Sequence, residues 1–279
     1  VMSTLATGAG GDRTIGNTYE FSGAVTLGNA SLDGVLTFGS TGALTGTASL
    51  TVDSSVVLNG AIGGGGMIKN GSGALTLRGA NTFSGGAVMN SGPVYVGHDA
   101  AFGTGSLTMG GAVISSDSAA PRTIGNTYTV GGAQTLGNST LNGTLTFSGP
   151  GTLSSPLTLT TDSAVVLSGV LAGGSGLTKV GTASLTLSGA NSFSGGVTVT
   201  GGTLRIGNDS ALGSGLLTLN TAGVVVSGDS VTARVLTNGF TIGADVTLGD
   251  TTNSGALTFG GAGALTSNVV VTVPSAVNW

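Results

Sequence analysis

The strongest constraint on this chain is a long internal repeat. The segment Arg13–Tyr19 recurs letter for letter at Arg122–Tyr128, and a third copy begins at Arg234 and aligns without a gap to the end of the sequence. The segment Ala74–Gly86 also returns, with few changes, as Ser184–Gly196. Repetition at a fixed period is typical of architectures in which one unit stacks on the next. The sequence therefore predicts a repeat protein.

The repeat predicts how the 279 residues are organised. We expect residues 1–12 to belong to a partial preceding repeat and residues 13–121 to form the first full repeat. Residues 122–233 form the second repeat, and residues 234–279 form part of a third. We expect these repeats to make one continuous solenoid rather than separate domains.

Short strands with glycine corners are predicted inside each repeat. Leu75–Leu77, Leu107–Met109, Leu185–Leu187 and Leu217–Leu219 all alternate apolar, polar and apolar residues. This period of two places the apolar side chains on one face of a strand and Thr on the other. Pairs such as Gly-Asn, Gly-Gly and Ser-Gly separate the strands and suit tight corners. No segment has the apolar spacing of an amphipathic helix, so we expect almost no helix.

Two architectures fit short strands with glycine corners: a sandwich of hairpins or a solenoid of stacked coils. A slip of one residue would turn every side chain of a strand to the opposite face. Identical side chains nevertheless recur in place over a long repeat. We therefore predict an all-β fold, a right-handed parallel β-helix in which the apolar residues of successive coils stack into one core. At roughly 22 residues per coil, the chain would make about a dozen coils.

The composition excludes several classes of protein. Charged residues make up 6% of the chain and the net charge is −4, so binding of nucleic acid through a basic face is excluded. Without cysteine there is no disulfide and no cysteine zinc site. The longest apolar runs, such as Val56–Leu58, are far too short to span a membrane, and Val1–Ala6 has no signal-peptide pattern.

Most charged residues follow the repeat, which argues for structural roles. The matching positions are Asp53 and Asp162, Asp99 and Asp209, Asp117 and Asp229, Lys69 and Lys179, and Arg13, Arg122 and Arg234. The other acids have no repeat partner and are interpreted as turn residues: Asp12, Glu20, Asp33, Asp245 and Asp250. A glycoside hydrolase would need two carboxylates about 5–10 Å apart. We expect these acids to be turn residues, with no catalytic, cofactor-binding or metal-ligating residue in the chain.

Several local motifs resemble functional sites but have simpler explanations. Gly228-Asp229-Ser230 is similar to a serine-protease nucleophile segment, but Val231 follows it and His98 is the sole histidine available as a base. His98 stands where the second repeat has Asn208, in a predicted turn. We interpret both features as structural.

Three further motifs are also interpreted as structural. Gly63–Gly66 lacks the Gly-Lys-Ser/Thr of a phosphate-binding loop and is interpreted as a solenoid corner. Gly8–Asp12 is a single incomplete version of a calcium-binding repeat. Phe83 and Phe193 are predicted to stack inside the fold rather than to form a platform for sugars.

One segment of each full repeat resembles a known family. Gly66–Gly86 and Gly176–Gly196, the second reading GLTKVGTASLTLSGANSFSGG, are followed by further matching sequence through Gly202–Gly215 in the second copy. The pattern is similar to the autotransporter-associated β-strand repeat of bacterial autotransporter passengers and large surface proteins. The resemblance implies a right-handed β-helix displayed outside a bacterial cell, as a stalk or an adhesive fibre. It implies no catalytic residues.

The expected function is therefore that of a non-enzymatic structural or adhesive segment at the bacterial surface. The expected partners are flanking repeats or further copies of the chain, stacked end to end or laterally, and glycans of a host or a biofilm. No cofactor and no nucleic acid is expected. The alternatives are a β-helical polysaccharide-active enzyme, which would need unique carboxylates on neighbouring coils, and a carbohydrate-binding module, which would need exposed aromatic residues.

Overall fold

The computed structural model describes residues 4–5, 11–31 and 34–279. In this part of the chain all regular structure is β-strand, and helix is absent, as the sequence predicts. The chain divides into two compact units, Val1–Thr129 with Thr140–Leu145, and Val130–Ser139 with Thr146–Trp279.

The first unit contains the strands up to β13 and the start of β14. Their bounds are β1 (Thr4–Leu5), β2 (Arg13–Ile15), β3 (Tyr19–Leu27), β4 (Leu36–Phe38), β5 (Gly42–Val52), β6 (Val56–Leu58), β7 (Ile62–Asn70), β8 (Leu75–Leu77), β9 (Ala87–Met89), β10 (Pro93–Val96), β11 (Leu107–Met109), β12 (Val113–Ser116), β13 (Arg122–Ile124) and β14 (Tyr128–Leu136).

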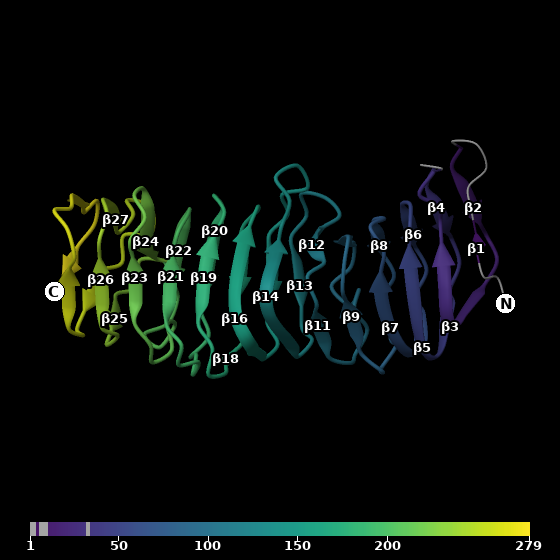
Figure 1. The fold of residues 1–279 in the computed structure, drawn as a ribbon, viewed down its shortest axis with the longest axis horizontal. Helices are drawn as coiled ribbons and strands as arrows, with labels where there is room; N and C mark the ends of the chain where they lie inside the picture. Colours follow the sequence, from purple (N-terminus) through teal and green to yellow (C-terminus); the bar gives the residue numbers. More distant parts are fainter. Residues whose placement is uncertain (1–3, 6–10, 32–33) are drawn as a thin grey trace. The chain divides into compact units, whose positions relative to one another are not determined.

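Strands of the first unit pair in parallel with the strand one coil further along, not with their sequence neighbours. One column runs β3, β5, β7, β9 and β11, and a second runs β2, β4, β6, β8, β10 and β12. Figure 1 shows β3, β5 and β7 side by side in purple and blue. Because hairpins would pair antiparallel, this parallel order excludes the sandwich.

The second unit holds the rest of β14 and the remaining strands, except that Leu145 of β15 is assigned to the first unit. Their bounds are β15 (Leu145–Phe147), β16 (Gly151–Thr161), β17 (Val165–Leu167), β18 (Leu171–Ala172), β19 (Leu177–Val180), β20 (Ser184–Leu187), β21 (Val197–Val199), β22 (Thr203–Ile206), β23 (Leu217–Leu219), β24 (Val224–Gly228), β25 (Arg234–Leu236), β26 (Phe240–Ile242), β27 (Val246–Leu248), β28 (Leu257–Phe259), β29 (Gly263–Leu265), β30 (Val271–Thr272) and β31 (Val277–Asn278).

The second unit is built from the same kind of parallel column. One column, visible from teal to yellow in Figure 1, consists of β16, β19, β21, β23, β26 and β29. A second column consists of β17, β20, β22, β24, β27 and β30. A third consists of β25, β28 and β31. Stacked partners lie between 19 residues apart, as Leu185 and Leu204, and 25 apart, as Val246 and Val271. The predicted fold class, a parallel β-solenoid, is thus confirmed, and the chain as a whole makes about 13 turns.

In-register stacking builds the core of the second unit. Leu157, Leu177, Val197 and Leu217 lie above one another and are all buried. Their neighbours Thr158, Thr178, Thr198 and Thr218 form the adjacent column, which faces outward. Complete burial of one such apolar side chain contributes about 1.5–3 kcal/mol. The predicted alternation of apolar and polar residues thus sets which face of each strand enters the core.

Glycine is needed where a coil corner passes close to the coil before it. Gly173 has a φ of +125°, and a Cβ atom at this position would lie 2.6 Å from the carbonyl oxygen of Leu153. Gly174, its neighbour, has no positive φ, and a Cβ atom there would meet nothing within 4 Å. Throughout the described residues, positive φ angles occur at glycine alone. The close approach, rather than flexibility, therefore explains much of the glycine content.

We predict that Gly173→Ala destabilises the chain and that Gly174→Ala does not. The first change forces an unfavourable φ and a clash with a backbone carbonyl, which costs about 1–3 kcal/mol. The second change stays within about 0.5 kcal/mol of the parent chain. Urea denaturation of the two variants beside the parent chain measures the difference. Equal midpoints for both variants would contradict the close-approach explanation.

Candidate functional site

Aspartate side chains at the corners bind the backbone of the following coil. Oδ1 of Asp99 accepts the N–H of Thr123 at 2.9 Å, and Oδ1 of Asp209, its repeat partner, accepts that of Val235 at 3.1 Å. The acids without repeat partners do the same: Asp12 accepts from Val35 at 2.9 Å, and Asp245 accepts from Val270 at 2.7 Å. These four carboxylates therefore cap corners, as the turn interpretation predicts.

The next pair of acids is held by arginine. Arg122 Nη2 lies 2.9 Å from Asp117, and Arg234 Nη2 lies 3.3 Å from Asp229. Arg78 adds a second contact to Asp117 at 3.0 Å. Burial raises the pKa of Asp117, but the hydrogen bonds from Arg122 and Arg78 outweigh it and hold the pKa below its usual value. A carboxylate held ionised in this way is a structural anion rather than a proton donor.

Ser230 is part of this arginine–aspartate corner and not a nucleophile. Its hydroxyl donates to Asp229 at 3.1 Å and accepts the N–H of Thr232 at 3.3 Å. In the first repeat Ser118 donates to Asp117 at 3.2 Å. A protease nucleophile would instead donate to a histidine.

Three further acids have no repeat partner: Glu20, Asp250 and Asp33. Glu20 lies within β3, so the prediction that it is a turn residue was wrong; the hydroxyl of Thr45 donates to its carboxylate. The N–H of Thr252 donates to Asp250 at 2.7 Å, and this bond helps to lower the pKa of that carboxyl, with Arg205 3.6 Å away. Asp33, like most of Gly8–Asp12, lies outside the described residues. Each described acid that lacks a repeat partner thus has a structural contact.

His98 forms a turn in the same way as its counterpart in the second repeat. Its Nδ1 accepts the N–H of Ala100 at 3.0 Å, and Oδ1 of Asn208 accepts the N–H of Ser210 at 2.9 Å. Among the described residues no group of three His, Asp or Glu side chains could hold a metal ion. The imidazole therefore replaces an amide as a hydrogen-bond acceptor in a turn.

The two repeat lysines lie inside the core. Lys69 stacks between Leu50 and Met89, and its side chain is 0% exposed. Its ammonium group donates to the carbonyl oxygens of Gly71 at 2.8 Å, Gly73 at 2.7 Å and Ser91 at 2.7 Å. Since Ser91 belongs to the next coil, the ammonium joins two consecutive corners.

Lys179 repeats this arrangement in the second unit. It stacks between Leu159 and Val199 and is also 0% exposed. Its Nζ donates to the carbonyl oxygens of Val180 at 2.8 Å, Gly181 at 3.0 Å and Gly201 at 3.1 Å. A buried ammonium needs partners for its three protons, and the corner carbonyls supply them.

Burial lowers the pKa of each lysine to about 8, and the nearby carboxylates, Asp53 for Lys69 and Asp162 for Lys179, oppose the shift. A base with a perturbed pKa can mark an active site. Here three backbone carbonyls contact each ammonium, and no hydroxyl or carboxylate does so. The geometry supports a structural cross-link between coils.

Two buried asparagines, which the sequence did not single out, have a similar role. Oδ1 of Asn81 accepts the N–H of Ile62, and its Nδ2 donates to the carbonyl of Ala101. Asn191 makes the equivalent bonds to Leu171 and Ala211. The available signal was an unchanged Asn at matching positions of the two repeats, followed by a buried Phe. It was not informative alone, because asparagine is also common in exposed turns.

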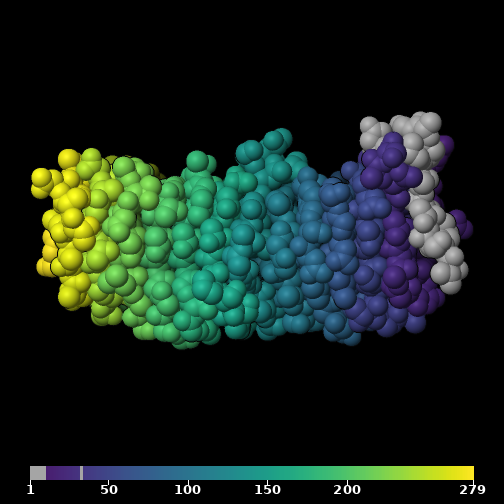
Figure 2. Space-filling model, in the orientation of Figure 1, coloured from purple at the N-terminus to yellow at the C-terminus, as the bar shows by residue number. Residues whose placement is uncertain are grey.

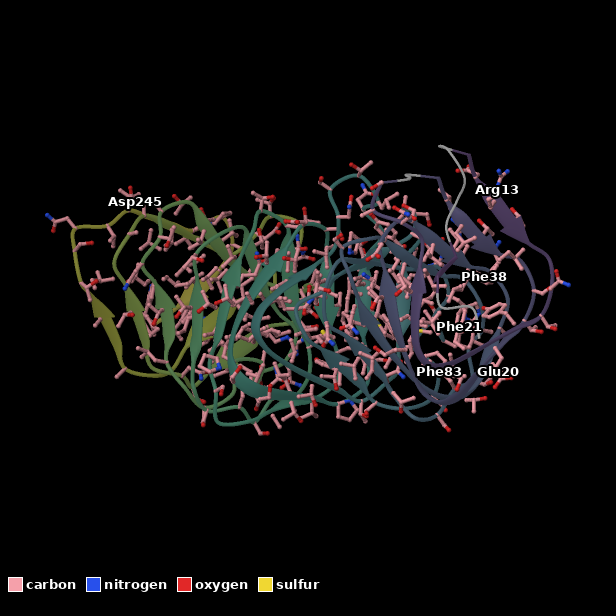
Figure 3. The ribbon with its side chains drawn as sticks, turned by 45° about the vertical axis from the view of Figure 1, so that its right-hand side comes forward. Arg13, Glu20, Phe21, Phe38, Phe83 and Asp245 are labelled. Carbon is pink, nitrogen blue, oxygen red and sulfur yellow. The ribbon has the colours of Figure 1, made fainter. Side chains whose placement is uncertain are left out.

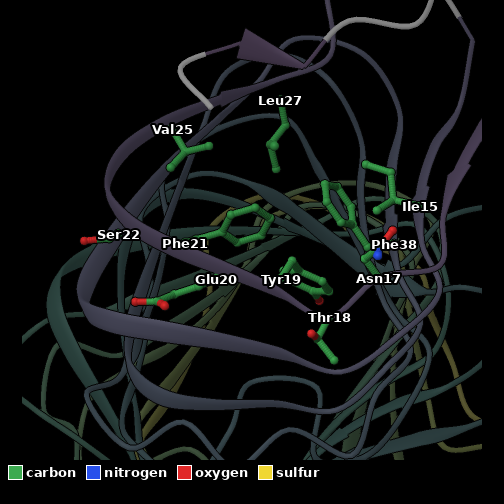
Figure 4. Close-up of a pocket in the computed structure, with 10 residues that line it drawn as sticks. All are labelled: Ile15, Asn17, Thr18, Tyr19, Glu20, Phe21, Ser22, Val25, Leu27 and Phe38. Carbon is green, nitrogen blue, oxygen red and sulfur yellow. The ribbon is translucent and has the colours of Figure 1, made fainter. Parts of the chain in front are cut away.

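A cavity of ≈ 670 Å³ lies against the first coil of the first unit (Figure 4). Its aromatic wall is formed by Tyr19, Phe21 and Phe38, with ring centroids 4.7–5.4 Å apart. Burial raises the pKa of Tyr19 and thus keeps its phenol neutral. The one carboxylate in the lining is Glu20, already bound to Thr45. The lining is mainly apolar, and Glu20 has no second acid or base beside it among the residues that line the cavity.

The remaining motifs also have structural positions. Phe83 and Phe193 are buried, so the prediction that they lie inside the fold is confirmed. Figure 3 labels Phe83 and also Glu20, whose side chain is exposed. The interpretation of Gly63–Gly66 as a solenoid corner was wrong, because these glycines lie within β7 and pair with β5. The register between the two strands shifts there, and Gly64 has a positive φ. A phosphate-binding loop would lead into a helix, and the described residues form none.

These observations define the class: a repetitive parallel β-solenoid whose charged side chains hold its corners. The passenger-associated-transport-repeat family matches residues 67–92 and 177–206, the segments that contain the buried lysines and asparagines. The resemblance of these two segments to autotransporter passenger repeats is thereby confirmed. No helix long and apolar enough to cross a membrane occurs in the described part of the chain.

Part of the chain is also similar to a curated autotransporter. The chain is 38% identical over 117 residues to the adhesin BmaC autotransporter of Brucella suis biovar 1 (strain 1330). This match covers 41% of the chain and 3% of the relative, so the chain corresponds to a small part of that protein's length. No solved structure matches the chain.

The buried lysines predict an unusual pH dependence of stability. Their folded pKa of about 8 lies below the unfolded value of about 10.4, so the unfolded chain binds more protons between these values. The free energy of unfolding should therefore rise from pH 8 to pH 9.5. Urea denaturation at both pH values measures the rise, and the variant K69M/K179M should lose it. If the free energy of unfolding of that variant rose equally between the two pH values, titratable groups other than the two lysines would be responsible.

The turn role of His98 leads to a prediction about the stability of two His98 variants. His98→Asn restores the acceptor used in the second repeat and should leave the free energy of unfolding within about 0.5 kcal/mol of the parent. His98→Ala removes the acceptor for the Ala100 N–H and should cost about 0.5–1.5 kcal/mol. Thermal denaturation with and without Zn²⁺ compares the variants. A stabilisation by Zn²⁺ that disappears in His98→Asn would indicate metal binding instead.

Proposed function

We propose that the chain is a non-enzymatic, adhesive solenoid segment of a bacterial autotransporter passenger, secreted or displayed at the cell surface. The observation that carries the proposal is the role of its charged residues. Asp99, Asp209, Lys69 and Lys179 all bind backbone groups of the solenoid. Side chains committed to the scaffold in this way support a structural role better than a catalytic one.

The comparisons support the adhesive part of the proposal. Two segments match a passenger repeat, and the relative that is 38% identical over 117 residues is named an adhesin. The outward faces of the coils are rich in uncharged residues such as Thr178 and Thr198. The hydroxyl groups of such faces can donate and accept hydrogen bonds with neutral glycans of a host or biofilm.

We include end-to-end stacking in the proposed function. Each coil pairs with the next through parallel backbone hydrogen bonds, and the same pairing can join the chain to flanking repeats or further copies. Stacking would place many similar faces along one fibre or stalk. Weak contacts repeated along it would then act together.

Surface display tests the adhesive function. The chain is fused to an autotransporter translocator in a non-adherent laboratory strain, and attachment to immobilised host matrix and biofilm polysaccharides is counted. We expect attachment well above that of the translocator alone at equal surface expression. Attachment no greater than this control on every substrate would contradict the adhesive function. Release of new reducing ends from the same polysaccharides by the purified chain would contradict the non-enzymatic assignment.

A further inference from the structure

A pocket of ≈ 330 Å³ opens at the surface of the first unit, in the coils coloured blue to teal in Figure 2. Two consecutive coils supply its lining. Asp99 and Thr104 come from the segment between β10 and β11, whereas Thr123 lies in β13 and Gly125 directly after it. Pockets for small ligands begin at roughly 300 Å³. The space therefore suits a single small molecule.

Two oxygen atoms at this pocket have no hydrogen-bond partner in the described part of the chain. Oδ1 of Asp99 accepts the N–H of Thr123 at 2.9 Å, which leaves Oδ2 of the same carboxylate unbound. The hydroxyl group of Thr123 is also unbound, and both side chains are exposed. A carboxylate oxygen accepts hydrogen bonds, and a hydroxyl group both donates and accepts them. Together they match the hydroxyl groups of a polar ligand.

The side chain of Asn126 holds the two coils of the pocket together. It is 8% exposed, and its Nδ2 donates to the carbonyl oxygens of Gly103 at 3.1 Å and Gly105 at 2.7 Å in the preceding coil. The N–H of Gly103 donates in turn to the carbonyl oxygen of Ala100 at 3.0 Å. A pocket fixed by such bonds needs little reordering when a ligand binds, which favours affinity.

The groups at the pocket match a neutral sugar better than a metal or a charged ligand. Asp99 is the single ionisable side chain of the lining, and one carboxylate is too few ligands for a calcium ion. It would repel an acidic sugar, and an ammonium group would gain only an exposed ion pair, which stabilises little. Neighbouring hydroxyl groups of a pyranose ring can donate to Oδ2 and exchange hydrogen bonds with Thr104 and Thr123.

The second repeat separates the structural role of this corner from a role in binding. Asp209 accepts the N–H of Val235 at 3.1 Å, as Asp99 accepts that of Thr123. Val235 is 46% exposed and carries methyl groups where Thr123 carries a hydroxyl group. The corner hydrogen bond therefore forms without the hydroxyl group, which is left for a ligand.

Gly125 differs between the repeats in the same way. Its counterpart is Thr237, and Asn238, which follows it, still donates to two carbonyl oxygens of the preceding coil at 3.0 and 2.8 Å, as Asn126 does. The coil thus forms with a larger side chain at this position. Glycine is not required by the corner, and it keeps open the space that it lines in the first repeat.

We propose that the pocket at Asp99 and Thr123 binds one neutral pyranose unit of a glycan. The inference rests on the proposed adhesive function and names where a sugar binds and through which groups. Neighbouring hydroxyl groups of the sugar donate to Oδ2 of Asp99, and the hydroxyl groups of Thr123 and Thr104 bind further oxygen atoms of the ring. A contact this small is weak by itself and becomes effective when many copies of the chain act together on one surface.

Nuclear magnetic resonance of the isotope-labelled full chain tests the site. Methyl glucopyranoside, methyl mannopyranoside and methyl galactopyranoside are titrated while the amide shifts of Thr123 and Gly125 are followed. We expect at least one of the three to cause saturable shift changes there, with a dissociation constant in the millimolar range. The absence of such changes with all three would overturn the proposal. Equally tight binding of methyl glucuronide or ethylammonium at these amides would overturn the assignment to a neutral sugar.

A matched pair of variants tests the carboxylate. Asp99→Asn keeps an amide oxygen for the Thr123 N–H and replaces the unbound oxygen atom by an NH₂ group. We expect affinity for the best glycoside to fall about ten-fold, because a hydrogen bond to a charged group is lost. Asp209→Asn makes the same change in the second repeat and should leave the affinity unchanged. Unchanged affinity in Asp99→Asn, or equal losses in both variants, would overturn the proposal.

The double variant Thr123→Val with Gly125→Thr gives the pocket the residues of the second repeat. Because the second repeat forms the same corner with these residues, we expect thermal unfolding like that of the parent chain. The saturable shift changes of the remaining amides around the pocket should disappear. Binding as tight as that of the parent chain would overturn the proposal.

Cell attachment separates failure of this site from failure of the adhesive function. The parent chain and Asp99→Asn are displayed on the same translocator, and we expect weaker attachment of the variant to a surface coated with the best glycoside. Equal attachment of both would leave the adhesive function standing and overturn the pocket as its site. Glycoside binding by the purified chain without attachment of the cells to any substrate would support the site and contradict the adhesive function.

Discussion

The parallel backbone ladder between successive coils is the interaction on which the rest of this structure depends. Leu177 pairs with Leu157 below it and Val197 above it, and the same residue type or size recurs along the column. Because the ladder fixes the register, one inward column is apolar and the neighbouring outward column, with Thr178 and Thr198, is polar. The cohesion therefore requires few ion pairs, which accounts for a charged fraction of 6%.

At the corners, backbone groups are not paired by the ladder between strands. Where the chain turns, carbonyl and N–H groups leave the strand pairing, and they need partners when buried. Lys69 and Lys179 bring three donors each to these carbonyls, Asn81 and Asn191 join three coils, and aspartates such as Asp99 accept N–H groups. The polar residues of the repeat thus supply hydrogen-bond partners for the backbone groups that strand pairing leaves without one.

Much of this arrangement could be predicted from the sequence, and what could not has a physical reason. Repetition and alternation of apolar residues predicted the parallel solenoid, and the match of His98 with Asn208 predicted a turn. The buried site of Lys69 was not predicted, because the corner carbonyls that stabilise an ammonium come from two coils and only stacking brings them together. The strand conformation of Gly63–Gly66 was not predicted for a related reason. Four consecutive glycines are typical of a corner, and it is the pairing with β5 that makes them part of β7.

The distribution of charge also limits how such a chain can adhere. With the lysines buried and most of the described carboxylates bound to backbone or arginine, the outward strands offer mainly hydroxyl and methyl groups, as along Thr158, Thr178, Thr198 and Thr218. A face of this kind lacks the long-range attraction that speeds encounters between opposite charges. The proposed adhesion must then depend on short-range contacts that are weak singly and repeated from coil to coil. A solenoid meets this requirement because each added coil repeats the face as well as the core.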